Sequence, residues 1–144
     1  MGADPIGVVR RLVDAINRHD SRAVEGLLDP AFRRHSLAAG ETGTENAADF
    51  LRFLEKEHET FPDAREELLE IFADGTKVAA VHRFTGTQHG QLGSHPPSGK
   101  RVRSVYIALY HIEDGCIRES WAEWDNLSEL RQLGHIPQNL QCAK

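Results

Sequence analysis

The sequence predicts an α+β fold in which N-terminal helices pack on a curved, mixed or antiparallel β-sheet and a short helix ends the chain. Most of residues 5–60 show the apolar spacing of amphipathic helices, while residues 64–124 form runs rich in β-branched and aromatic side chains. The length of 144 residues and the 40% hydrophobic content fit one domain with a sizeable core. We therefore treat residues 1–144 as a single domain.

A β-hairpin in the C-terminal third is the strongest local signal. The apolar run Val102–Ile112 precedes Asp114 and Gly115, the pair that a two-residue type I′ turn favours. A turn at this pair brings Ala108 close to Ala122 on the returning strand. Even-numbered residues of the hairpin then share one face of the sheet, and odd-numbered residues share the other.

The two faces of this hairpin differ in character. The even-numbered face mixes aromatic rings, a hydroxyl and very small side chains, as the floor of a ligand pocket does. Its members are Tyr106, Ala108, Tyr110, Ser120, Ala122 and Trp124. The odd-numbered face is closer to ordinary packing and carries Val105, Ile107, Leu109, Ile117, Trp121 and Glu123. We expect the even-numbered face to be the functional one, with Glu123 outside unless a bulge turns it inward.

Capping residues and prolines delimit the helices. The expected helices run from Pro5 to about Ile16, from Ser21 to Leu28, and from about Glu45 to Thr60. Asp4 and Pro5 open the first helix and Asp20 or Ser21 begins the second, while Pro30 and Pro62 end the second and third helices. Asp125 can cap a last short helix that stops at Gly134.

Three further strands complete the predicted sheet. They are Ala31–Ser36, Ala64–Ala73 and Lys77–Thr85. The second run also fits a helix, but Arg65, Glu67, Leu69 and Ile71 alternate along it, and a turn at 74–75 leads directly into the next strand. The loop at 90–99 then places His82 beside Ala108 or within one pair of it.

Composition argues against several classes of partner. The net charge of −5 gives no electrostatic reason to bind nucleic acid, and no apolar run approaches the roughly 20 residues of a membrane span. We therefore expect a cytoplasmic protein with a hydrophobic small-molecule substrate. The eight histidines show no metal-binding spacing, and phosphate-binding glycine loops are missing from the sequence, so no metal and no cofactor are expected. Cys116 and Cys142 are expected to be free thiols.

Several short segments together resemble the SnoaL-like polyketide cyclases of the nuclear-transport-factor-2-like superfamily. They are residues 8–17, Phe61-Pro62-Asp63, Thr85-Gly86-Thr87, residues 96–100, residues 112–117 and residues 130–134. The resemblance covers nearly the whole chain and implies a cone-shaped α+β fold. It also implies a small cofactor-free enzyme, acting on a polyketide-like or polycyclic substrate, that forms a homodimer or homotetramer.

The resemblance also implies where the catalytic residues should lie. Aldol cyclases of this family use an Asp on the last strand, assisted by a His and a Gln on the neighbouring strand. Those positions fall on Ala122, Ala108 and Tyr106 in this sequence, so none of the three residue types is retained. Alanine cannot exchange a proton, and the family's aldol mechanism is therefore not inherited unchanged.

His82 is the leading candidate for the missing proton-transfer group. Its imidazole titrates near neutrality and is expected to project over Ala108 and Ala122. Tyr106 is the second catalytic candidate, as a donor to a developing oxyanion. Both residues have a structural alternative, as a core histidine bonded to a neighbouring hydroxyl and as a packed strand aromatic.

The remaining candidates are expected to bind substrate. They are Ile16, His35, Phe53, Phe84, Ala108, Tyr110, Ser120, Ala122 and Trp124. Ordinary packing is the alternative for Tyr110 and Trp124, and a solvated surface position is the alternative for His35. Two functions follow from the sequence: a cyclase or isomerase using general acid and base catalysis, or a non-catalytic carrier that keeps the cone. A relative that opens an epoxide or dehydrates an alcohol is a further enzymatic possibility.

Overall fold

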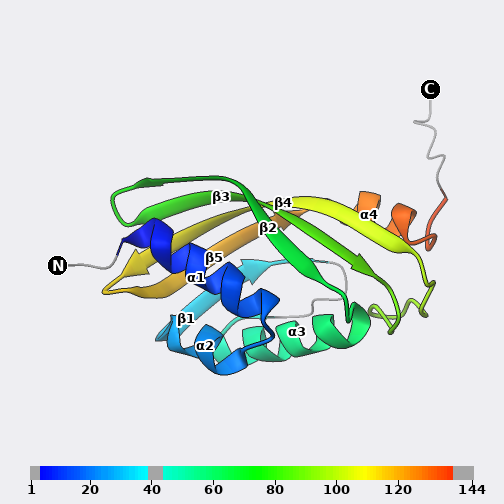
Figure 1. Ribbon diagram of the computed structural model, residues 1–144, viewed down its shortest axis with the longest axis horizontal. Helices are drawn as coiled ribbons and strands as arrows, with labels where there is room; N and C mark the ends of the chain where they lie inside the picture. The colour runs from blue at the N-terminus through cyan, green and yellow to red at the C-terminus, as the bar shows by residue number, and fades with distance from the viewer. Residues whose placement is uncertain (1–3, 39–43, 138–144) are drawn as a thin grey trace.

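The computed structural model describes residues 4–38 and 44–137, in which helices pack on one face of a strongly curved sheet (Figure 1). The helices are α1 (Pro5–Asn17), α2 (Ser21–Gly26), α3 (Ala47–Thr60) and α4 (Asn126–Gln132). The strands are β1 (Leu28–Ser36), β2 (Arg65–Asp74), β3 (Lys77–Thr87), β4 (Arg101–Glu113) and β5 (Cys116–Trp124). They lie in the order β1-β5-β4-β3-β2, with β1 parallel to β5 and the other pairs antiparallel. The predicted α+β class is confirmed.

The predicted capping residues begin the helices. The Asp4 side chain accepts a hydrogen bond from the backbone amide of Ile6 at the start of α1. The Asp125 side chain accepts one from the backbone amide of Ser128 at the start of α4. Such a cap satisfies a backbone amide that has no partner within the helix. Helix α1 lies across β2, while α4 packs against β4 at the other end of the sheet (Figure 1).

The predicted end of the second helix is wrong. Helix α2 stops at Gly26, and Leu28 already begins β1, which runs through Pro30 to Ser36. Proline is tolerated in β1 because this strand lies at the edge of the sheet, and the register with β5 shifts between Leu28 and Arg33. The short strand predicted at 31–36 is therefore the second part of a nine-residue strand.

The predicted hairpin register is confirmed at its centre. Ala108 pairs with Ala122, and Tyr106 pairs with Trp124. His82 pairs with Tyr106, which lies two residues before Ala108 on β4 and on the same face. A shift of two residues leaves the side chains on their expected faces, and the inward-facing residues of β3 are all buried. They are Val78, Ala80, His82 and Phe84.

One residue of the hairpin lies on the face opposite to the predicted one. Ile117, expected on the outer face, is fully buried. The register between β4 and β5 shifts between His111 and Ile112, and a one-residue shift turns the following side chains to the other face of the sheet. Glu123, beyond this bulge, pairs with Ile107 on the outer face as expected.

The outer face of the sheet carries exposed apolar side chains. Val105, Ile107 and Leu109 of β4 are 45%, 59% and 40% exposed. Phe72 of β2 is 66% exposed. The described part of the chain contains no helix long and apolar enough to cross a membrane.

Candidate functional site

A cavity of about 420 Å³, partly open to solvent, lies between the helices and the concave face of the sheet. We call it the cone cavity. Apolar and aromatic side chains form most of its wall, and a few polar groups interrupt them. The lining residues are Leu12, Ile16, Leu28, Phe32, Arg34, Phe50, Phe53, Leu54, Glu57, Glu66, Tyr106, Tyr110, Ile117, Ser120 and Trp124. An apolar wall with few convergent polar groups is typical of a small-molecule site.

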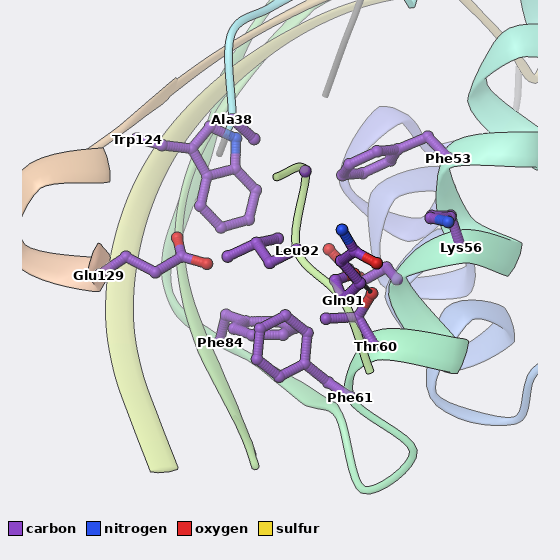
Figure 2. Close-up of a pocket in the computed structure, with 12 residues that line it drawn as sticks. Ala38, Phe53, Lys56, Thr60, Phe61, Phe84, Gln91, Leu92, Trp124 and Glu129 are labelled. Atoms are coloured by element: carbon purple, nitrogen blue, oxygen red, sulfur yellow. Dashed lines mark hydrogen bonds between the residues drawn. The ribbon is translucent and has the colours of Figure 1, made fainter. Parts of the chain in front are cut away.

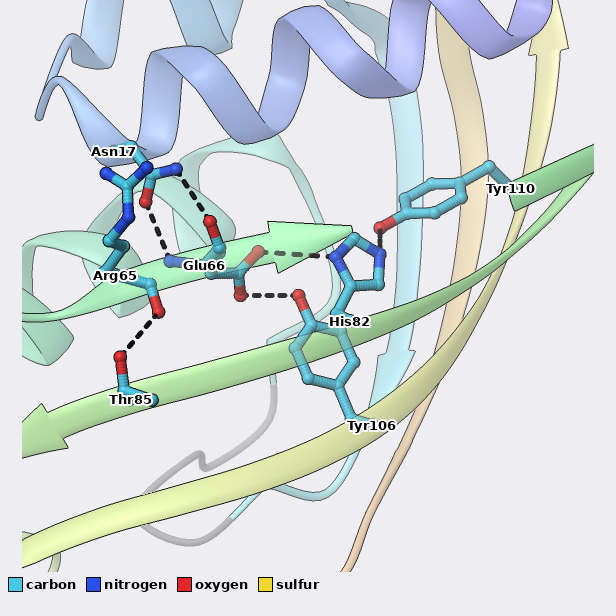
Figure 3. Close-up of polar contacts among 7 residues, drawn as sticks. All are labelled: Asn17, Arg65, Glu66, His82, Thr85, Tyr106 and Tyr110. Carbon is cyan, nitrogen blue, oxygen red and sulfur yellow. Dashed lines mark hydrogen bonds and ion pairs between the residues drawn. The ribbon is translucent and has the colours of Figure 1, made fainter. Parts of the chain in front are cut away.

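Glu66 is the acidic centre of a buried polar network on this wall (Figure 3). The Tyr106 hydroxyl donates to Glu66 Oε1 at 2.5 Å, and Glu66 Oε2 lies 3.4 Å from Nδ1 of His82. On the other side of the imidazole, Nε2 lies 2.9 Å from the Tyr110 hydroxyl. Glu66 is 6% exposed and His82 is fully buried, so the network is shielded from water.

The pattern of donors and acceptors favours one arrangement of hydrogens. A neutral His82 with its hydrogen on Nδ1 points that hydrogen at Glu66 and accepts the Tyr110 hydroxyl on Nε2. Glu66 then accepts the hydrogen bond from the Tyr106 hydroxyl. The 3.4 Å contact with His82 is too poorly aligned to count as a hydrogen bond, so the Nδ1–H dipole and the carboxylate interact through their electrostatic attraction alone.

The two tyrosines are donors in this network rather than bases. Burial raises the pKa of Tyr106 well above its ordinary value, and the neighbouring Glu66 charge raises it further. Burial and the same charge raise the pKa of Tyr110, against a smaller opposing effect of Arg34. Both hydroxyls therefore keep their hydrogens at neutral pH, and Glu66 is the proton acceptor of the network.

The backbone of Glu66 is fixed by the end of α1. The Asn17 side chain accepts the backbone amide of Glu66 at 2.8 Å and donates to its carbonyl at 2.9 Å (Figure 3). The imidazole of His82 stacks on the Tyr106 ring, with centroids 4.4 Å apart and planes 2° from parallel. Tyr106 stacks in turn on Trp124 at 3.8 Å. These contacts hold the carboxylate and the rings in one geometry.

Two further polar atoms on the cavity wall are available to a ligand. Within the described residues, Oγ of Ser120 and Nε1 of Trp124 are buried and have no hydrogen-bond partner. The Arg34 guanidinium lies 4.7 Å from the ring centre of Phe50 and 5.4 Å from that of Phe53, which places a positive charge in the same cavity. Buried groups without partners cost free energy, so a ligand that bonds to them gains affinity.

A second cavity of about 450 Å³, also partly open to solvent, adjoins the first one (Figure 2). We call it the end pocket. It shares Phe53, Glu57 and Trp124 with the cone cavity. Its remaining wall comes from the end of α3, from β3 and the loop after it, from α4, and from a residue that follows β1. These residues are Ala38, Lys56, Thr60, Phe61, Phe84, Gln91, Leu92, Gly93 and Glu129.

The structure brings most of the predicted site residues together. Ile16, Phe53, Tyr106, Tyr110, Ser120 and Trp124 line the cone cavity, and Phe84 lines the end pocket. Ala108 and Ala122 are buried but are not among the described lining residues. His82 also lies behind the wall, in contact with the rings of Tyr106 and Tyr110. His82 is not among the residues that line either cavity.

His35 lies away from both cavities. Half of its side chain is exposed, its Nε2 pairs with Oε2 of Glu119 at 2.7 Å, and its ring stacks on Trp121 of the outer face. The three carboxylates among the described lining residues, Glu57, Glu66 and Glu129, were not predicted from the sequence. Glu66 lies two residues before Leu68 on a strand, and Glu129 lies four residues before Leu133 on a helix. Each spacing places the carboxylate on the same face as a core leucine, and this was the sequence signal for an inward-facing side chain.

Comparisons with known proteins identify the family. The family model described as SnoaL-like polyketide cyclase matches residues 6–133. The chain belongs to the SnoaL-like polyketide cyclase family. No curated protein sequence matches this SnoaL-like chain.

Solved structures show the same fold as this SnoaL-like chain. IdmH, a proposed polyketide cyclase from Streptomyces antibioticus, is 25% identical with a TM-score of 0.81, over 92% of this chain and 99% of its own. TsrD from Streptomyces laurentii is 27% identical with a TM-score of 0.80, over 91% and 95%. AclR, a proposed hydroxylase from Streptomyces galilaeus, is 25% identical with a TM-score of 0.80, over 92% and 97%. The predicted cone fold of the nuclear-transport-factor-2-like superfamily is thereby confirmed.

The potential metal ligands of this SnoaL-like domain do not gather at one site in the described residues. Across residues 4–38 and 44–137, no three His, Cys, Asp or Glu side chains cluster closely enough to hold a metal ion. Cys116 is a free thiol, while Cys142 lies outside the described residues.

Proposed function

We propose that the protein is a cofactor-independent cyclase or isomerase that moves a proton on a polyketide-type or polycyclic small molecule. The observation that carries the proposal is the position of Glu66, a buried carboxylate on the wall of an apolar cavity, next to two tyrosine hydroxyls. An ionised carboxylate shielded from water can act as a general base, and neutral hydroxyls can stabilise the negative charge that forms.

The network suggests how one proton transfer would proceed. Glu66 takes a proton from the carbon next to a substrate carbonyl, which leaves an enolate. Once Glu66 is protonated, its hydrogen bond from the Tyr106 hydroxyl weakens. That hydroxyl can then donate to the enolate oxygen. Return of the proton at another carbon gives an isomer. Attack of the enolate on a second carbonyl gives a ring, and the new alkoxide takes the proton from Glu66.

His82 takes a positioning role in this proposal. Its imidazole does not reach the cavity, but it orients Glu66 and accepts the Tyr110 hydroxyl. The sequence suggested His82 as the group that exchanges the substrate proton, and we assign this role to Glu66 instead. Tyr106 keeps its proposed role as the donor to the oxyanion, because it lines the cavity.

A non-catalytic carrier is the second candidate. Two observations favour it: the positions to which the family resemblance assigns the acid and the histidine hold Ala122 and Ala108, and neither lines a cavity within the described residues. Epoxide opening or dehydration are alternatives within the enzymes. AclR, a relative of similar fold, is itself described as a proposed hydroxylase.

Deuterium exchange on a simple bicyclic ketone tests the proposal. We expect the protein to accelerate exchange of the α-protons of 2-tetralone in deuterated buffer, followed by nuclear magnetic resonance. Replacing Glu66 with glutamine should lower this exchange rate about 100-fold, because the amide cannot accept the proton. The variant keeps nearly the same shape and remains able to bond to Tyr106 and His82.

A neighbouring carboxylate provides the matched control. Glu67→Gln removes the same charge from the exposed face of β2 and should leave exchange unchanged. Equal exchange in the wild type and Glu66→Gln would contradict the proposed base. Tight binding of 2-tetralone without any accelerated exchange would favour the carrier.

We further propose that the protein associates through the exposed apolar residues of β4, as a homodimer or homotetramer. Val105, Ile107 and Leu109 form a continuous row on the outer face. An apolar row that is exposed in a single chain is usually buried in an interface between chains. Light scattering should give the mass of two or four copies. Glu substitution at Ile107 should shift it to one copy, and a single-copy mass in the wild type would contradict the proposal.

A further inference from the structure

Glu129 is a buried acidic side chain of the end pocket. It lies on α4, is 5% exposed, and extends its carboxyl group into the pocket towards Leu92 (Figure 2). The aromatic rings of Phe61, Phe84 and Trp124 surround the same space. On the α4 side, the pocket therefore combines flat apolar walls with a buried carboxyl group.

The carboxyl group of Glu129 makes no hydrogen bond or ion pair with residues 4–38 and 44–137. A buried carboxylate without a partner is costly, and the group avoids this cost by keeping its proton. Burial raises the pKa of Glu129 to about 7, and burial is the single cause of the shift. The protonated acid is a hydrogen-bond donor, whereas the ionised form can only accept.

We infer that Glu129 is a binding residue that donates a hydrogen bond to the carbonyl oxygen of a flat aromatic ketone held in the end pocket. The rings of Phe61, Phe84 and Trp124 suit the flat part of such a ligand, and the carboxyl group suits its oxygen. The end pocket and the cone cavity share Phe53, Glu57 and Trp124 in their walls, so a ligand held by Glu129 would lie next to the cone cavity.

This inference rests on the small-molecule binding part of the proposed function and does not need proton transfer. Binding to the end pocket and exchange at Glu66 are measured separately, so either one can fail alone. The charged side chains that face Glu129 across the pocket are Lys56 and Glu57 of α3. On its own helix the charged neighbours are Arg131 and the capping residue Asp125.

Binding of 9-fluorenone, compared with binding of fluorene, tests the inference. The two tricyclic probes have the same flat shape, but fluorene lacks the carbonyl oxygen. By equilibrium dialysis, we expect the wild type to bind fluorenone roughly tenfold more weakly at pH 8.5 than at pH 5.5, since the donor is lost on ionisation. Binding of fluorene should change little over the same range.

Two substitutions at position 129 show whether the pH dependence of fluorenone binding belongs to Glu129 or to another charged group. Glu129→Gln keeps a donor that does not ionise, so it should bind fluorenone with similar affinity at both pH values. Glu129→Leu should bind fluorenone roughly tenfold more weakly than the wild type at pH 5.5 and should bind fluorene normally. Thermal unfolding of each variant checks that it is folded.

Several results would overturn the inference. One is wild-type affinity for fluorenone that does not change with pH. A second is a pH dependence that persists in Glu129→Gln, since it would then belong to another group such as Lys56 or Glu57. Wild-type affinity in Glu129→Leu, or no binding of fluorenone at pH 5.5, would also contradict it.

Discussion

Replacing His82 with leucine should lower the free energy of unfolding by about 3 kcal/mol, because it leaves two buried polar groups without a partner. Leucine has a similar volume, so the change is mainly electrostatic. The Glu66 carboxylate loses the imidazole that lies 3.4 Å away, and the Tyr110 hydroxyl loses its acceptor at 2.9 Å. Both groups stay buried and cannot turn to water. Urea unfolding at pH 7 measures the effect.

A double-mutant cycle shows whether the charge of Glu66 is responsible. In a Glu66→Gln background the carboxylate is already neutral, so His82→Leu should cost about 1–3 kcal/mol less than in the wild type. Val78→Ala is the matched control, because Val78 lies four residues away on the same strand and is equally buried. Its cost should be the same in both backgrounds. Additive costs for His82 and Glu66 would contradict an electrostatic contact between them.

The same variants report on the positioning role of His82. If His82 only orients Glu66, exchange of 2-tetralone in His82→Leu should be slower than in the wild type but still faster than in Glu66→Gln. A purely structural role would leave the exchange rate of the folded variant unchanged. This distinction matters because His82 lies behind the cavity wall, in contact with Tyr106 and Tyr110 rather than with the cavity.

The sequence predicted the sheet well because its central strands obey a simple rule. On β3 and β4 the inward and outward side chains alternate, and the Asp114-Gly115 turn fixes their register. An error of two residues in the pairing of His82 left its face unchanged. Ile117 was misplaced because a bulge changed the register by one residue, and a bulge has no clear sequence signal.

The same effect explains why Glu66 was not predicted. From the turn at 74–75, β2 pairs with β3 so that Ile71 lies opposite the inward-facing Ala80. Without a bulge, Glu67 and Leu69 would also face inward. The register shifts between Leu68 and Glu70, so Leu68 and Glu66 face inward instead. One extra residue in β2 therefore turns Glu66, rather than Glu67, to the inner face of the sheet.

Glu129 was missed for a different reason. A glutamate in a short helix usually faces water, and the sequence around it shows only the cap at Asp125 and the stop near Gly134. Glu129 lies one helical turn before Leu133, which is fully buried, so the two side chains share the inner face of α4. That spacing indicates burial but not an open pocket beside the carboxyl group, which depends on the loop residue Leu92 and on β3.

Burial of Glu129 also makes stability depend on pH when no ligand is present. The folded-state pKa is about 7, raised from an ordinary value of 4.5. Between these values the folded chain keeps a proton that the unfolded chain releases, so the free energy of unfolding falls as pH rises through this range. Below pH 4.5 the two states bind this proton equally, and above pH 7 the full cost is present. A shift of this size corresponds to about 3 kcal/mol.

Glu129→Gln should remove this dependence, because the amide does not titrate. Urea unfolding of the wild type and the variant from pH 4.5 to pH 8 should show the variant gaining about 3 kcal/mol relative to the wild type. All other titrating groups are common to both proteins and cancel in the difference. Glu123→Gln is the control, since that carboxylate lies on the exposed outer face and should give no such trend. A constant difference between wild type and Glu129→Gln would mean that Glu129 ionises normally in the folded chain, and the end pocket would then hold an acceptor rather than a donor at neutral pH.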